Sequence, residues 1–304
     1  MDKISAKIVA DSINPEGNRI TTMEVVFPRI ILSEFNTHRM FSRNSASSRA
    51  IPFKKMLKMV EEDPFIPIAW QKAHKGMQGN QYFDTGQSKA QSIRWLQARD
   101  EAIRLAKSLD YEGVTKQITN RLLEPFMHHK VLVTATEWDN FFKLRAHKDA
   151  EIHIADLAYK MQAALQASTP KKLKAGEWHI PFGDNMNLST LPYIEDATEA
   201  QVQQLKVKIA TARCARISYQ TLGDDPKIDY EKDIALHDQL LVSGHMSPFE
   251  HCARAMSPTE YLAHQVIKTH STFALGQYDA GTIRENGWCR NFKGFIQYRE
   301  IVEK

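Results

Sequence analysis

One short segment of the chain concentrates basic and hydroxyl side chains. Residues 37–49 hold four basic side chains and five hydroxyl groups within thirteen positions. The guanidinium groups of Arg39, Arg43 and Arg49 offer forked donors, and the neighbouring serines add short hydroxyl donors, a combination that binds phosphates. The segment therefore indicates a phosphate site. A solvated basic loop is the alternative interpretation of the same composition.

Two further arginines stand at the edges of apolar stretches. Arg121 precedes an apolar pair and Pro125, and Arg145 ends a segment rich in aromatic residues. A guanidinium group in such a place can face a bound anion. A surface arginine with no ligand is the more usual explanation.

A turn in the second half of the chain brings a histidine, a hydroxyl group and an acid close together in sequence. His245, Ser247 and Glu250 fall within residues 244–251, where Pro248 excludes a continuous helix. Such groups can act as general acid and base. A purely structural turn explains the segment as well.

Residues 147–153 suggest a metal site at first sight. A spacing of four pairs His147 with Glu151 and Asp149 with His153. On a helix these two pairs face different directions, so we expect no metal here. A metal-dependent hydrolase built on this segment is the hypothesis with the least support.

The three cysteines, Cys214, Cys252 and Cys289, lie far apart in the sequence. They form neither a disulfide framework nor a paired metal motif. None has the surroundings of an activated nucleophile, so we expect small buried side chains.

The elements that must position these groups are mixed. Residues 18–35 are rich in β-branched and aromatic side chains around Pro28, which predicts a strand followed by a short helix. Residues 75–90 are rich in Gly, Gln and Asn and predict an exposed loop. Apolar spacing predicts helices over 93–109, 114–122, 138–144, 154–165, 199–212 and 231–243.

The chain divides into three parts by composition. Residues 169–197 have the prolines, glycines and lysines of a linker, between a segment 1–168 and a segment 198–304. With several helices and few strong strands, we predict an α+β fold whose sheet draws strands from distant segments. The segments together are expected to form one compact domain.

Length and charge exclude several classes. A chain of 304 residues with a formal net charge of +4 lacks the charge of a histone-like nucleic-acid binder. Its longest apolar runs fall far short of the roughly 20 residues that span a bilayer. Residues 1–5 lack the pattern of a secretory signal, so we expect a cytoplasmic protein without membrane contact.

Several motifs carry a resemblance to a known family. His38, Arg39, Ser42, Asn44, Ser47 and Arg49 resemble the RHR-x2-S-x-NE-x-S-x-RY signature of the flavin-dependent thymidylate synthases, the ThyX family. Residues 113–125 resemble the family's stretch that ends in LP, residues 140–145 resemble its N-F-x-x-LR helix, and residues 150–153 stand where it has AQ-x-E.

Two motifs of the family occur out of order. Residues 215–219, Ala-Arg-Ile-Ser-Tyr, resemble its AARVSY, and residues 244–251 resemble its GH-x-[ST]-PFEH. Both precede the RHR signature in the family and follow it here. The resemblance therefore implies a circularly permuted ThyX-like fold, with a central sheet flanked by helices.

The resemblance also implies an activity. Members of the family bind FAD between the subunits of a homotetramer, transfer a methylene group from methylenetetrahydrofolate to deoxyuridylate, and reduce the product with a flavin hydride, which NADPH replenishes. We therefore expect a thymidylate synthase-type methyltransferase that acts on a small nucleotide and needs no cysteine nucleophile or nucleic acid.

Site residues carry over position by position from these motifs. The resemblance assigns FAD binding to His38, Arg39, Asn44, Asn140, Ser218, His245, Ser247 and Glu250. It assigns nucleotide binding to Glu34, Ser47, Arg49, Arg121 and Arg145. Arg145 and Ser47 are the catalytic candidates, because a permanently charged guanidinium can stabilise negative charge on the base and a serine can donate to the phosphate.

Three positions depart from the family pattern. Thr37 replaces the first Arg of RHR, Ser45 replaces the Glu of NE, and Glu34 stands where the family has a Gln. An ionised Glu only accepts hydrogen bonds, and cytosine offers an amine donor where uracil offers a carbonyl. Methylation or hydroxymethylation of deoxycytidylate is therefore an alternative within the family.

A hypothesis of a different class is a nucleic-acid binding module. It would use the Arg-rich segment 39–49, with Phe41 stacking on bases. The near-neutral net charge makes it the weaker hypothesis.

Overall fold

The computed structural model describes residues 3–76, 79, 81–183, 186–192, 194–217, 229–274 and 277–303. Its strands are β1 (Ser5–Ile13), β2 (Arg19–Pro28), β3 (Ser42–Ser45), β4 (His128–Ala135), β5 (Lys171–Lys172), β6 (Trp178–His179), β7 (Ala253–Ala255), β8 (Gln265–Ala274), β9 (Gln277–Asn286), β10 (Trp288–Cys289), β11 (Phe292–Lys293) and β12 (Phe295–Gln297). Its α-helices are α1 (Leu32–Asn36), α2 (Phe53–Glu62), α3 (Thr85–Tyr111), α4 (Lys116–Thr119), α5 (Asp139–Arg145), α6 (Ile152–Ala167), α7 (Glu199–Arg216), α8 (Tyr230–Val242), α9 (Pro258–Ala263) and α10 (Tyr298–Val302). Short 3-10 helices are η1 (Arg29–Ile31), η2 (Asn120–Leu122), η3 (Glu124–Phe126), η4 (Leu188–Thr190) and η6 (Ser247–Glu250).

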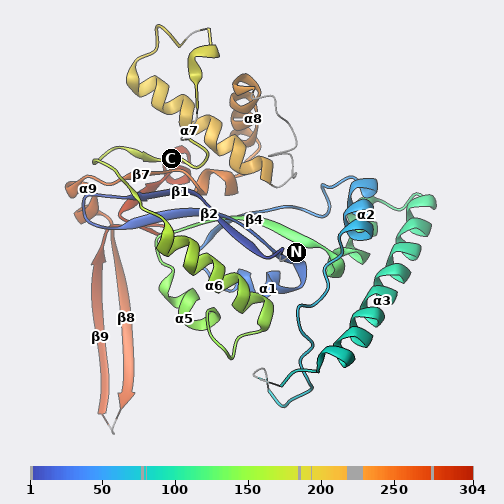
Figure 1. The fold of residues 1–304 in the computed structure, drawn as a ribbon. Coiled ribbons are helices and arrows are strands. Elements are labelled where there is room, and N and C mark those ends of the chain that lie inside the picture. The colour runs from blue at the N-terminus through green and yellow to red at the C-terminus, as the bar shows by residue number, and fades with distance from the viewer. Residues whose placement is uncertain are drawn as a thin grey trace.

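A five-stranded sheet forms the centre of the molecule, in the order β3-β4-β2-β1-β5 (Figure 1). All its neighbouring strands are antiparallel except β1 and β5, which pair in parallel. Strand β4 lies opposite β2 along its whole length, from His128 against Pro28 to Ala135 against Thr21. The sheet therefore joins segments that are more than a hundred residues apart.

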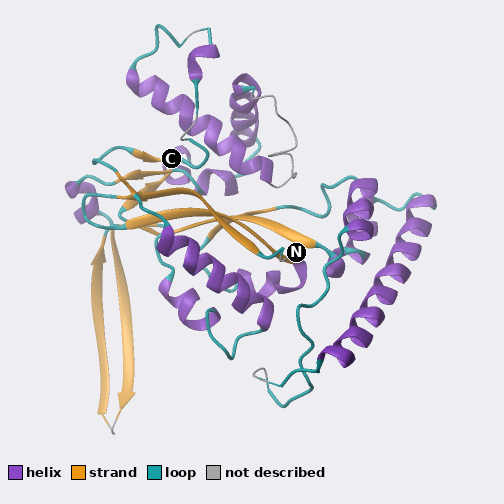
Figure 2. Cartoon of the chain, viewed as in Figure 1, coloured by secondary structure: helices purple, strands orange, loops and turns teal. Residues whose placement is uncertain are grey.

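Both faces of this sheet are covered. On one face, Met23, Val25 and Phe27 of β2 pack with residues of α5 and α6 in the largest core cluster. On the other face, Leu132 of β4 packs with Cys214 near the end of α7. Figure 2 shows helices on either side of the strands. The expected α+β fold with a central sheet flanked by helices is confirmed.

Two parts extend from this centre. Helices α2 and α3 share a separate core with η2 and η3, built from residues such as Met56, Ile103 and Leu123. Strands β8 and β9 form a long antiparallel hairpin that projects away from the sheet (Figure 1). In the described part of the chain, no helix is long and apolar enough to cross a membrane.

The expected helices and strand occur near their predicted positions, with one wrong boundary and several missed strands. The predicted loop over 75–90 is too long, because Asp84 caps α3 by accepting from the backbone N–H of Gln87 and the helix starts at Thr85. Strands β1 and β4 were not expected. Strand β4 is buried on both faces, so it lacks the alternation that marks a half-exposed strand.

Residues 169–197, expected to be a linker, contribute strands. Lys171 and Lys172 of β5 pair with Ser12 and Ile13, and β6 pairs with β7. Strand β7 also pairs with β12, which forms a small three-stranded sheet.

The circular permutation of the fold stays a prediction. It would require residue 251 and the start of β2 to be neighbours in space. Ile20 of β2 packs in one cluster with Ala253 and Ala255 of β7, all three fully buried.

A chain of hydrogen bonds runs through the buried interior between the two sheets. Ser12 Oγ lies 2.9 Å from Nδ1 of His179, and the Nε2 atom of that ring lies 2.9 Å from Thr22 Oγ1. Thr22 Oγ1 lies 2.7 Å from Thr134 Oγ1, which lies 2.8 Å from Nδ1 of His251. Each hydroxyl and imidazole can donate and accept, so the chain links these groups without a charge, although Nε2 of His251 has no hydrogen-bond partner among the described residues.

Burial keeps these imidazoles neutral. It lowers the pKa values of His129, His179 and His251 to about 3 and those of His38 and His128 to about 4. The unfolded chain binds protons at these sites below about pH 6.5 while the folded chain does not, so folding stability is present above that pH and is lost as pH falls.

We expect the free energy of unfolding to fall between pH 6.5 and pH 4, by up to about 1.4 kcal/mol per pH unit for each of these imidazoles. Urea unfolding at several pH values measures this slope. His179→Gln retains a donor and an acceptor and should reduce the slope by the contribution of one proton, about 1.4 kcal/mol per pH unit. A free energy of unfolding that is constant from pH 6.5 to pH 4 would contradict this account.

Candidate functional site

A cluster of aromatic rings holds the segment between α1 and β3. Phe35, Phe41, Trp138 and Phe141 are buried against one another, with ring centroids 4.8 to 5.8 Å apart. His38 packs edge-on against Phe141 at 4.8 Å. The aromatic packing thereby fixes the position of the His38 ring.

Arg145, the last residue of α5, contacts this histidine. Its Nε–H donates to Nε2 of His38 at 3.0 Å, and an Nη–H donates to Thr37 Oγ1 at 3.5 Å. Burial first, and then the charges of Arg145 and Arg43, lower the pKa of His38 to about 4. The ring is therefore neutral at pH 7, accepts at Nε2 and carries its proton on Nδ1.

A cavity of about 410 Å³ opens beside this pair. It is lined by Thr37, His38, Arg39, Met40, Phe41, Glu137, Asn140, Phe141 and Trp288. The cavity thus combines a cation, a neutral imidazole and an amide with an aromatic wall, and its volume is typical of small-molecule sites. Three residues predicted to bind FAD, His38, Arg39 and Asn140, meet here.

A second cluster lies at the other end of β3. The side-chain amide of Asn120 donates to the backbone oxygens of Ser48 and Ile51, at 2.7 and 2.9 Å, and so holds the turn that carries Arg49 against η2. The Ser48 hydroxyl donates to Glu124, whose carboxylate lies 3.8 Å from Arg121.

Ser47 and Arg49 therefore lie in one turn, and Arg121 follows Asn120 in η2 beside it; their phosphate contacts stay predictions. Arg49 is exposed and has no partner among the residues that the structure describes. Between this turn and His38 runs β3, whose four residues span about 13 Å. Arg145 thus lies at the opposite end of β3 from the other two arginines.

A third polar group connects the 244–251 segment to β3. Glu250 accepts from Arg299 at 2.7 Å, and its charge also acts on Arg43. The side-chain amides of Asn291 and Gln297 donate to Ser42 Oγ at 2.9 and 3.3 Å. The end of the chain thereby anchors the start of β3.

Several predicted site residues lie outside the cavity at His38. Asn44 donates to the backbone oxygen of Cys214 at 3.1 Å, which directs its amide toward α7. His245 is exposed beside Ser243, at 2.9 Å, and Ser247 starts η6. Ser218 lies outside the described residues. The FAD contacts of these residues stay predictions.

Two hypotheses from the sequence meet contrary geometry. Phe41 is only 4 % exposed and packs within the aromatic cluster at the cavity, so it offers no open surface for a nucleic-acid strand, as the alternative hypothesis would need. In residues 147–153, the segment of the metal hypothesis that has the least support, Glu151 caps α6 and binds His153, whose Nε2 accepts from the backbone N–H of Ile68. Among the described residues, no three His, Cys, Asp or Glu side chains group as metal ligands would.

Comparisons with known proteins agree with the motifs. The family model described as "Thymidylate synthase complementing protein" matches residues 19–171, half of the chain. The chain belongs to this family, ThyX.

Two solved structures are similar to part of the molecule. Both are of the UMP/dUMP methylase PolB from Streptomyces cacaoi, one with 5-Br dUMP and one with 5-Br UMP. Each is 16 % identical and covers 54 % of this chain, with 90 % and 89 % of the PolB chain covered and TM-scores of 0.45 and 0.44. No curated protein matches the sequence.

The ThyX match ends before residues 288–299, which were not expected in the site. Trp288 lines the cavity, and Asn291, Gln297 and Arg299 hold β3 and Glu250. One signal was available: polar side chains alternate with aromatic ones over residues 291–299. Which polar group they would meet was not visible in the sequence.

Two departures from the ThyX signature have local consequences. Thr37 donates to the backbone oxygen of Glu34 at 2.7 Å and accepts from Arg145. Its hydroxyl therefore links α1 to α5. The Glu34 carboxylate is half-buried and accepts from Ser33 at 2.9 Å.

We expect Arg145→Ala to raise the pKa of His38 from about 4, because the cation nearest to the ring is removed. The value should stay below 6.5, since burial remains the largest cause of the shift. NMR titration of the His38 ring measures this change, with Lys143→Ala on the same helix as the control. An unchanged titration in Arg145→Ala would show that the contact with His38 is not formed.

Proposed function

We propose that this chain is a flavin-dependent enzyme that methylates deoxyuridylate at C5, with methylenetetrahydrofolate as the carbon donor. One observation supports this most directly. His38, Arg39 and Asn140 come from segments a hundred residues apart and line a single cavity, and Arg145 contacts His38 beside it.

The residues around this cavity fit a flavin. Phe41, Phe141 and Trp288 supply an apolar wall for a planar ring. The Asn140 amide can both donate and accept, as the edge of an isoalloxazine requires, and exposed Arg39 can pair with a phosphate. When bound, FAD would supply the hydride that reduces the transferred carbon, after reduction by NADPH.

The turn at Arg49 suits the phosphate of the nucleotide. Arg49 and Arg121 provide two guanidinium groups, and the Ser47 hydroxyl can donate beside them. Glu124 near Arg121 limits the positive charge of this turn. Because β3 separates this turn from Arg145, we propose that a second copy of the chain completes each site, as in a homotetramer.

Arg145 is the residue to which we assign the base. Two of the five N–H donors of a guanidinium contact His38 and Thr37, which leaves three for a ligand. Its permanent charge can stabilise the negative charge that develops on the pyrimidine ring, while neutral His38 fixes its direction.

Purified protein should be yellow and show the visible absorption of oxidised flavin, directly or after FAD is added. Arg39→Ala should weaken FAD binding by about 10- to 100-fold, because it removes a charge-assisted hydrogen bond. Arg94→Ala, on exposed α3, serves as the matched control. A colourless protein that takes up no FAD would count decisively against the proposal.

Glu34 supports a second candidate substrate, deoxycytidylate. The residue lies on α1, where its backbone oxygen accepts from Thr37, the residue that also accepts from Arg145. Its carboxylate could accept from the amine of cytosine.

We expect Glu34→Gln to shift the ratio of kcat/KM values toward deoxyuridylate by about 10-fold or more, since one hydrogen bond to a charged group changes. A folate-dependent turnover assay with both nucleotides measures the ratio, and Ser33→Ala tests the neighbouring hydroxyl. If the ratio is the same in Glu34→Gln and wild type, Glu34 does not recognise the base.

A further inference from the structure

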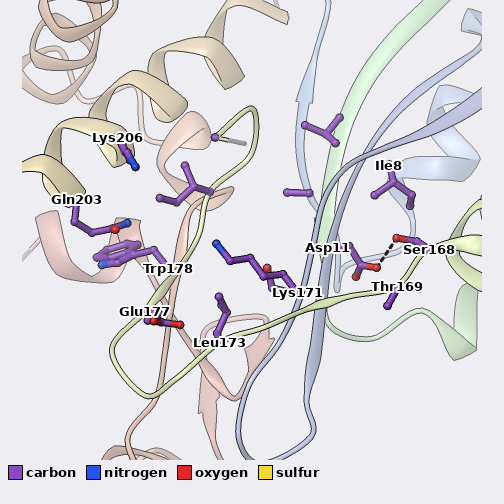
Figure 3. A pocket seen from close by; sticks show the side chains of 15 residues that line it. Ile8, Asp11, Ser168, Thr169, Lys171, Leu173, Glu177, Trp178, Gln203 and Lys206 are labelled. Carbon is purple, nitrogen blue, oxygen red and sulfur yellow. Dashed lines mark hydrogen bonds between the residues drawn. The ribbon is translucent and has the colours of Figure 1, made fainter. Parts of the chain in front are cut away.

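A second cavity, of about 530 Å³, lies between the main sheet and α7. Strand β1 forms one wall, β5 and the residues before it another, and β6 and α7 the side opposite to β1 (Figure 3). It shares no residue with the cavity at His38, and none of the residues matched to the ThyX motifs lines it. The proposed methylation therefore leaves this cavity without a role.

Two lysines face this cavity without counter-ions. Figure 3 shows Lys171 of β5 and Lys206 of α7 directed into the same space. Neither ammonium group has an ion-pair or hydrogen-bond partner among the described residues. Because like charges in one cavity repel, an anion placed between them would lower the electrostatic energy.

The acidic residues of the wall are already engaged. Asp11 accepts from both Nε and an Nη of Arg19, at 2.9 and 2.6 Å, and from Ser168 at 2.6 Å. Glu177 accepts from the backbone N–H of Lys174 at 2.8 Å. Arg19 thus compensates the charge of Asp11, whereas Glu177 keeps its negative charge. The two lysines outnumber this one carboxylate, so the lining keeps a net positive charge and favours a negative ligand.

The same cavity offers an aromatic surface and an amide. Trp178 is half-buried and is held edge-on against Tyr298, with centroids 5.6 Å apart at 82°. Gln203 lies beside it on α7 (Figure 3). A fixed indole can stack on a planar base, and a free amide can both donate to and accept from the edge of a base.

The β1 wall adds unpaired backbone groups. Strand β5 pairs with β1 only at Ser12 and Ile13, so the preceding residues of β1 form an open edge toward the cavity. The register of β1 shifts between Ile8 and Ala10, which turns the strand at this point. Irregularities of this kind are common beside binding sites.

We propose that this cavity binds a nucleoside phosphate, with the phosphate between Lys171 and Lys206 and the base against Trp178 and Gln203. Two point charges suit a phosphate dianion, and the enclosed volume suits one small molecule rather than a polymer. The site is separate from the one proposed for methylation, so it offers a place for a nucleotide that regulates the enzyme.

Equilibrium dialysis of the full chain with deoxyuridylate tests the proposal. Lys171→Ala/Lys206→Ala should weaken one class of binding sites by at least about 10-fold, because charge-assisted hydrogen bonds are lost. Lys172→Ala/Lys174→Ala removes the same charge from the same segment outside the cavity and should have no such effect. Lys171→Arg/Lys206→Arg keeps the charges and should retain binding.

Three further arms complete the test. Inorganic phosphate should bind more weakly than deoxyuridylate, and deoxyuridine without phosphate should bind weakest. Arg49→Ala/Arg121→Ala addresses the other nucleotide site, so an absent effect there would count against the proposed methylation and not against this cavity.

Equal binding by the two lysine double variants would overturn the proposal. So would tight binding of an oligonucleotide together with no binding of the mononucleotide. Inorganic phosphate that binds as tightly as deoxyuridylate would overturn the assignment of the base to Trp178.

Discussion

Strand β4 pairs with β2 along one edge and with β3 along the other, and the candidate site depends on these two ladders. The pairing places the end of β4 beside the start of β3, where Phe141 of the following segment packs on His38 and Trp138 packs on Phe41. At the other end, η3 leads into β4 and brings Glu124 to the turn at Ser48. A single long strand thus sets the positions of both clusters.

Burial of the sheet on both faces explains much of the polar chemistry inside. A charged imidazole in this interior would be strongly disfavoured, so His179 and His251 are neutral and bonded to hydroxyl groups. At the edge of the interior the same effect has a functional consequence. Burial and the neighbouring cations keep His38 neutral, which lets its Nε2 accept from Arg145 and orient that cation.

Much of the fold was predictable wherever local signals were strong. The strand that ends at Pro28, the helix over 152–167 and the helix that ends before Gly244 all have such signals, the last because Gly244 adopts a φ of +72°. Strand β4 and the pairing of β5 could not be predicted in this way. An apolar run buried on two faces shows no alternation of apolar and polar residues, and a two-residue strand is too short to show any hydrophobic pattern.

For the candidate site, too, some features were predictable from local sequence and others depended on the tertiary structure. The residue types alone, with their spacing in the 37–49 segment and around Arg121 and Arg145, were enough to indicate the family and a phosphate-binding chemistry. Only the folded chain decided which of these groups meet. It placed Arg145 on His38, turned Asn44 toward Cys214, recruited Trp288 and Asn291 from the far end, and left Lys171 and Lys206 facing a second cavity. The physical reason is that strand pairing and burial join distant residues, whereas spacing along the chain reports only on neighbours.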